Sequence, residues 1–211
     1  MRTILSRTRR TVVAVAAGLA LVGSGIYAAA ANSDMSESKS EDAPAKTESP
    51  LRQLIEAYRT TAPFHNVDNA LAAGWEVQPM CMDYPDGLMG EAPGTMGHHF
   101  FNVDYLSDGG RIDPSEPELV LYEKRANGTW RLNAVEYIIS ARDLPGTAPA
   151  PELFGQKFTW FPDVGAAGVW GLHVWLWRAN PHGLFANLNP LVTCAHADAM
   201  HMPGQSHMPG H

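Results

Sequence analysis

The chain of 211 residues contains 22 acidic and 15 basic side chains, which gives a formal net charge of −7 at pH 7. Nucleic acids and anionic membrane surfaces attract proteins through a cationic face, so this acidic balance disfavours both as partners. Hydrophobic residues make up 45% of the chain, a proportion that is typical of a globular protein with a packed core.

The first 31 residues have the composition of an export signal. Four arginines, at positions 2, 7, 9 and 10, precede an apolar run over residues 11–31 that ends in four alanines, and this order is typical of a signal peptide. The paired Arg9 and Arg10 also fit a twin-arginine signal, and retention as a single-pass anchor is the alternative. We expect a secreted or periplasmic protein without a membrane attachment, whose net charge changes from −7 to −11 when the four arginines are removed.

The remaining sequence divides into three parts. Residues 32–50 are polar and charged, so they cannot bury enough apolar surface to fold and predict a disordered linker. Residues 51–195 predict a single α+β domain that is large enough for a hydrophobic core. Residues 196–211 repeat His-Met-Pro-Gly, and this composition predicts a disordered tail.

The predicted domain begins with helices. Apolar residues recur at intervals of three and four over residues 51–58, after a Ser-Pro pair that suits a helix N-terminus. A second helical pattern over residues 67–73 stops at Gly74, a residue suited to a helix C-terminus. We expect these helices to pack on an antiparallel sheet that curls toward a barrel.

The first histidine pair lies on a predicted strand at 97–106, which follows a short strand at 75–80 and a long loop rich in Gly, Pro, Asp and Met. Alternation along the strand places His98 on the more polar face and His99 on the more apolar face. This favours His98 as the pocket residue, and a slip of one residue in register would exchange the two.

A carboxylate is predicted within an apolar face of a hairpin. Asn127 and Gly128 favour a type I′ turn between two alternating segments, and the resulting register puts Leu119 opposite Glu136 on the expected core face. A buried carboxylate must be paired, protonated or bound to a metal. Glu136 is therefore a candidate ligand, and an ion pair is the alternative.

The tryptophan-rich segment near the C-terminus predicts the central strand of the sheet, over residues 170–177. Alternation gives two largely apolar rows, one of which contains His173. Together with His98 or His99 and Glu136, His173 forms a candidate internal site if the three strands are neighbours. Two imidazoles and a carboxylate suit zinc, iron or copper and leave a position open for water or substrate. A core histidine bonded to the backbone is the alternative.

The two cysteines, Cys81 and Cys194, predict a disulfide because an exported protein meets oxidising conditions. Two free thiols that bind a metal beside Met80 and Met82 are the alternative.

The tail is a second candidate metal site. Soft thioether sulfur and borderline imidazole nitrogen suit Cu(I), and the histidines also suit Cu(II), nickel or zinc. An unselected low-complexity end is the alternative. The candidate ligands of the tail are His196, Met200, His201, Met202, His207, Met208 and His211.

The stretch of roughly residues 52–194 contains five motifs, which lie between residues 96 and 194: MGHHFFN, PELVLYE, NAVEYII, ELFGQKF and GLHVWLWRANPHGLFANLNPLVTC. In this combination the chain resembles a family of uncharacterised secreted bacterial proteins. The resemblance implies no activity, substrate or catalytic residue, and the His/Met tail lies outside it. The sequence therefore predicts an exported metal-binding protein with a copper-preferring tail. A metal-dependent enzyme or small-ligand binder at His173 and a structural domain without a site are the alternatives.

Overall fold

The computed structural model describes residues 48–197, which fold into helices and an antiparallel sheet. The helical elements are α1 (Pro50–Thr61), η1 (Ala62–His65), α2 (Val67–Ala72) and α3 (Val103–Leu106). Ser49 and Asn66 begin α1 and α2, because each side chain accepts a hydrogen bond from a main-chain N–H of the first turn. Among the described residues, no helix is long and apolar enough to cross a membrane.

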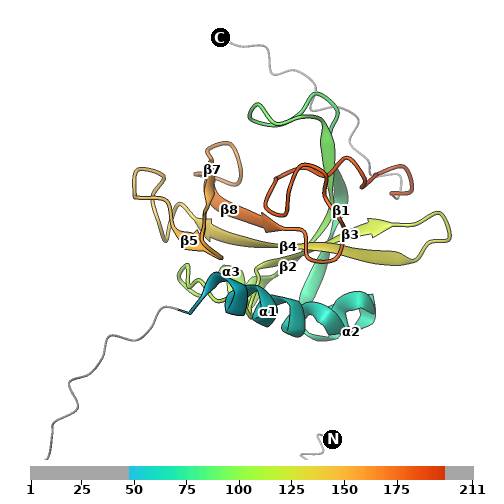
Figure 1. Ribbon diagram of the computed structural model, residues 1–211, viewed down its shortest axis with the longest axis horizontal. Helices are drawn as coiled ribbons and strands as arrows, with labels where there is room; N and C mark the ends of the chain where they lie inside the picture. The colour runs from blue at the N-terminus through green and yellow to red at the C-terminus, as the bar shows by residue number, and fades with distance from the viewer. Residues whose placement is uncertain (1–47, 198–211) are drawn as a thin grey trace, which may run out of the picture. The chain divides into compact units, whose positions relative to one another are not determined.

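Six strands form one antiparallel sheet in the order β1-β2-β3-β4-β8-β7, and β5 and β6 form a separate pair. The sheet curls into a half-barrel, with α1 and α2 on one side of it (Figure 1). The predicted α+β class with a barrel-like sheet is confirmed. The strands are β1 (Trp75–Tyr84), β2 (Gly94–Asn102), β3 (Leu119–Lys124), β4 (Trp130–Ser140), β5 (Glu152–Leu153), β6 (Gln156–Lys157), β7 (Thr159–Phe161) and β8 (Val169–Val174).

Several strand ends differ from the sequence-based prediction. β1 continues to Tyr84, so the loop between β1 and β2 contains only residues 85–93. β2 ends at Asn102, because the Asn102 side chain accepts hydrogen bonds from two main-chain N–H groups and begins α3. β8 ends at Val174 and lies between β4 and the edge strand β7, so it is not the central strand that was expected.

The predicted hairpin is present, with a local change of register. Leu119 pairs with Glu136 as expected, but the register shifts between Leu121 and Tyr122, so that Tyr122 pairs with Leu132. Leu132 consequently packs with the helices, on the face opposite Glu136. The prediction of one core face is therefore wrong, because this bulge divides the apolar residues of the hairpin between two buried faces.

The two faces of the sheet have separate apolar clusters. The cluster on the helical side joins residues of α1, η1 and α2 to the sheet, through Ala57, Phe64, Ala70, Val120, Tyr122, Leu132, Val135, Tyr137, Leu172 and Val174. The cluster on the opposite side consists of Met96, Leu119, Leu121, Ala134, Trp175, Leu188 and Val192. A sheet that is buried on both faces removes the simple alternation of polar and apolar residues from its strands.

Two segments distant in sequence cover the second face. One is the cover loop, residues 85–93, and the other is the strap, residues 184–194, which lies on the opposite side of the sheet from α1 and α2 (Figure 1). Thr95 and Asn189 join the strap to β2 through two main-chain hydrogen bonds of 3.1 Å. The disulfide between Cys81 and Cys194 ties the end of the strap to β1, which confirms the predicted pairing and rules out the free-thiol alternative.

Candidate metal centre

Three strands bring His99, Glu136 and His173 to one place on the strap-covered face. Glu136 on β4 is the direct cross-strand partner of His173 on β8. His99 on β2 reaches the same carboxylate across β3. These three groups are therefore neighbours because of strand order, although 74 residues separate the first from the last in sequence.

The distances between the potential ligand atoms fit a bound metal ion. His99 Nε2 lies 3.3 Å from Glu136 Oε2, and His173 Nε2 lies 3.5 Å from Glu136 Oε1. One ligand atom from each residue can be chosen so that all lie within 4.8 Å of one another. Tetrahedral zinc with bonds of about 2.0–2.1 Å separates its ligand atoms by about 3.3–3.4 Å. The two measured separations are close to this size, but they involve different oxygens of Glu136, so the side chains must move for one carboxylate oxygen to bind the ion together with both imidazoles.

The cluster is buried, and burial together with the charges of its members sets its protonation. Burial acts to raise the pKa of the Glu136 carboxyl, but the His173 and His99 imidazoles outweigh it and lower that pKa. Burial also lowers the pKa of His173, and the Glu136 charge only partly opposes this effect. A carboxylate and a neutral imidazole are the forms that bind a metal ion.

The ring of His173 is short of hydrogen-bond partners. Its side chain is 1% exposed, yet neither ring nitrogen completes a hydrogen bond of good geometry. Buried polar atoms of native proteins are nearly always satisfied, so an orphaned pair of nitrogens needs an explanation. The ring has no hydrogen bond to the backbone, so the expected alternative of a core histidine bonded to the backbone is absent among the described residues, and the neighbouring side chains could hold a metal ion at Nε2.

The space beside Glu136 is narrow. A Cβ atom at Gly171 would lie 2.9 Å from the Phe161 ring and 3.3 Å from Glu136 Oε1, so a glycine keeps space beside the carboxylate. The side chain of His99 is 13% exposed and offers the contact with solvent. The cluster is consequently largely buried, and His99 is its most exposed member.

His98 does not join the cluster, and the preference for it over His99 is wrong. Its side chain lies on the helical side of the sheet, where the ring packs edge-on against Trp130 with 4.9 Å between centroids. His98 Nδ1 also lies 3.4 Å from the carbonyl oxygen of Gln78. The sequence of β2 alone makes the His99 face look apolar. The polar neighbours of His99 on that face, Glu136 and His173, come from β4 and β8.

Two residues that the sequence analysis missed lie beside the cluster. The Asn187 side chain acts on the His173 ring and, with Glu91, raises its pKa against the effect of burial. Asn187 also binds Glu91 through two hydrogen bonds. Neither residue has a local sequence signal, because they come from the strap and the cover loop, which are 96 residues apart.

Most of the predicted tail site lies outside the described residues. His196 is exposed at the end of the described chain. Met200, His201, Met202, His207, Met208 and His211 lie beyond it.

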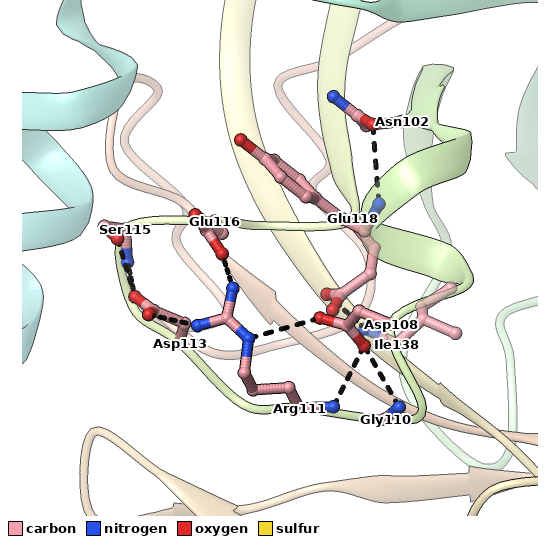
Figure 2. A network of polar contacts seen from close by, with 10 residues as sticks. Asn102, Asp108, Gly110, Arg111, Asp113, Ser115, Glu116, Glu118 and Ile138 are labelled. Atoms are coloured by element: carbon pink, nitrogen blue, oxygen red, sulfur yellow. Dashed lines mark hydrogen bonds and ion pairs between the residues drawn. The ribbon is translucent and has the colours of Figure 1, made fainter.

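A second buried acid, Glu118, directly precedes β3 and belongs to no group of three potential metal ligands among the described residues. Its Oε2 accepts the Ile138 N–H at 3.0 Å, and burial, with a contribution from the Asp108 charge, raises its pKa to about 8. Figure 2 shows it beside a loop in which Arg111 forms ion pairs with Asp108, Asp113 and Glu116. This network holds the loop together and leaves Glu118 as a hydrogen-bond acceptor for the sheet.

Comparisons with known proteins return no relative: no family model, no curated protein and no solved structure matches the chain. The class of protein is therefore defined by what the structure itself contains, an α+β half-barrel with a His/Glu/His cluster that could hold a metal ion.

Proposed function

We propose that this protein is an exported metal-binding protein whose internal centre consists of His99, Glu136 and His173. The observation that carries the proposal is the convergence of these ligands from three strands, with ligand atoms at metal-binding separations. An ordinary ion pair needs only one imidazole for one carboxylate. Here two imidazoles face the two oxygens of a single carboxylate in a buried site, which suits a divalent transition metal.

Export and copper preference belong to the same proposal. Export rests on the signal-like N-terminus, and the disulfide between Cys81 and Cys194 is compatible with an extracellular compartment. The resemblance to secreted bacterial proteins agrees with this address. Copper preference rests on the paired histidines and methionines of residues 196–211, which add a soft ligand set to the borderline one inside the domain.

Titration of the full chain with Zn(II), Co(II) and Cu(I) tests the proposal, alongside a variant that lacks residues 196–211. We expect the shortened variant to keep one tight Zn(II) or Co(II) site and to lose Cu(I) capacity. The substitution His99→Ala should remove the internal site, whereas His182→Ala, in an exposed turn, is the matched control. The internal site is refuted if the shortened variant binds no metal ion more tightly than tens of micromolar.

A metal-dependent enzyme is the second candidate function. Three protein ligands leave a fourth position free on a tetrahedral ion, and the partial exposure of His99 gives that position a route to solvent. With Co(II) bound, an exchangeable water at this position would be displaced by azide and change the visible spectrum. A spectrum that azide leaves unchanged would indicate a closed site that only holds the metal.

A further inference from the structure

The turn between β3 and β4 exposes the one Asn-Gly pair of the sequence. The main-chain N–H of Gly128 donates to the Arg125 carbonyl oxygen at 2.9 Å, and that of Arg125 donates to the Thr129 carbonyl oxygen at 2.8 Å. Of the described residues in this turn, only Gly128 has a positive φ, which is 79°. The loop is therefore a type I turn closed by a glycine bulge, in place of the expected type I′ turn.

The side-chain oxygen of Asn127 receives two hydrogen bonds from Thr129. The Thr129 hydroxyl donates to Asn127 Oδ1 at 2.7 Å, and the Thr129 main-chain N–H donates to the same oxygen at 3.1 Å. Two donors on one carbonyl oxygen are the arrangement by which enzymes stabilise the negative charge of a tetrahedral intermediate. The amide carbon of Asn127 is therefore polarised toward attack by a nucleophile.

The main-chain nitrogen of Gly128 is a nucleophile next to this carbon, because a bond from it to Asn127 Cγ closes a five-membered ring. Glycine has no side chain beside the attacking nitrogen, and a Cβ atom placed on Gly128 would have no neighbour within 4 Å. The hydrogen bond from Gly128 to Arg125 must break when the nitrogen loses its proton. Both residues are exposed, so water can replace that bond at little cost.

We propose that Asn127 is a self-modification site, at which the turn converts the asparagine to aspartate or isoaspartate. Hydroxide from the solvent removes the Gly128 N–H proton, the nitrogen bonds to Asn127 Cγ, and Oδ1 carries the negative charge between the two Thr129 donors. The Cγ–Nδ2 bond then breaks, and ammonia leaves with a proton from water. Water opens the resulting succinimide at either carbonyl. The reaction consumes water and releases ammonia, and nothing is oxidised or reduced.

The modification goes beyond the proposed function and does not depend on it. Each conversion adds a negative charge at the tip of the hairpin, and isoaspartate also lengthens the main chain of the turn. The pair of Leu119 and Glu136 lies at the other end of the hairpin, beyond the register shift between Leu121 and Tyr122. We therefore expect converted protein to keep the folded sheet and any metal affinity of the internal cluster.

The first test incubates the purified full chain at about pH 8 and follows each asparagine by peptide mapping, with detection of the mass increase and of isoaspartate. We expect conversion at Asn127 and much slower conversion at Asn66. Asn66 is the internal control, because it is also exposed and its Oδ1 accepts the Asp68 N–H at 3.2 Å, but the branched Val67 follows it. Equal rates at the two asparagines, or an unchanged Asn127, would overturn the proposal.

The second test isolates the contribution of Thr129. Thr129→Val removes the hydroxyl and keeps the shape and the main-chain N–H, so conversion of Asn127 in the folded protein should slow by about 2–10-fold, the effect of one ordinary hydrogen bond. Thr129→Ser keeps the hydroxyl and should react within about 2-fold of wild type. In urea, where the turn is unfolded, all three proteins should react at the same rate. Equal rates for folded wild type and folded Thr129→Val would overturn the assignment of the turn as the promoter of the reaction.

Discussion

Two buried carboxyl groups, Glu136 on β4 and Glu118 directly before the neighbouring strand β3, have opposite properties. Both are at most 5% exposed, and burial favours the neutral form of each. For Glu136 two imidazoles outweigh burial and lower the pKa. For Glu118 the hydrogen bond from a main-chain N–H lowers the pKa less than burial raises it, so the pKa of this carboxyl is about 8. Burial alone therefore does not identify a functional acid, and the partners decide whether the charge is kept.

The largest expected effect is on metal binding at Glu136. Glu136→Gln removes the charge of a candidate ligand while it keeps the shape of the side chain. An internal metal site should therefore lose more than about 100-fold in affinity, which is more than the typical loss when a residue that only hydrogen-bonds a ligand is removed. Glu118→Gln should leave the affinity within about 3-fold of wild type, since in the described part of the chain no hydrogen bond or ion pair joins Glu118 to a candidate ligand. Zn(II) competition titrations measure both, and equal losses would contradict the distinction between the two acids.

The next effect is on stability at alkaline pH. The folded-state pKa of Glu118 is raised from 4.5 to about 8. Its contribution to the free energy of unfolding is therefore fully present below pH 4.5 and is lost as the pH rises through about 8. The linked loss is about 3–5 kcal/mol at most. Glu118→Gln should abolish this loss, because an amide stays neutral and its oxygen still accepts the Ile138 N–H. Urea unfolding at pH 5, 7 and 9 measures it; a variant with the wild-type slope would contradict the assignment.

Acid should affect the two regions in opposite directions. Protonation keeps Glu118 in its preferred neutral form, whereas protons compete with a metal ion for imidazole ligands. We expect metal affinity to be constant above about pH 7. Below about pH 6 it should fall by about 10-fold per pH unit for each histidine ligand that becomes protonated. Because burial lowers the pKa of His173, this ring should stay available to lower pH than an exposed histidine. Co(II) titrations across pH 5–8 measure the fall, and an affinity independent of pH would exclude imidazole ligands.

The smallest effect is expected from the ion pairs of Arg111. They are visible in Figure 2 beside Glu118, but the Arg111 side chain is 51% exposed. Exposed ion pairs contribute about 0–1 kcal/mol. Arg111→Ala should therefore cost less than about 1 kcal/mol of unfolding free energy and leave the pH dependence of Glu118 in place. A larger cost in urea unfolding would show that the loop network, rather than burial, governs this acid.

The sequence predicted those features that depend on local patterns. The Asn-Gly turn predicted the pairing of Leu119 with Glu136, and the expectation of an oxidising compartment predicted the disulfide. The choice between His98 and His99 failed because a strand covered on both faces has no clean alternation, and the deciding groups lie on other strands.

Other features had no local signal in the sequence. The register shift after Leu121 depends on how two strands twist against each other, and it moved Leu132 to the helical side. The contact between Glu91 and Asn187 depends on how the strap folds back over the sheet. Long-range contacts of this kind are set by tertiary packing, so a single sequence does not reveal them.

The most direct test of the metal centre is anomalous X-ray diffraction from crystals of the protein grown with Zn(II). The account predicts one anomalous peak inside the half-barrel, about 2.0–2.2 Å from His99 Nε2, from a Glu136 oxygen and from His173 Nε2. An empty cluster, in which the carboxylate keeps both imidazoles as ion-pair partners at saturating Zn(II), would contradict it.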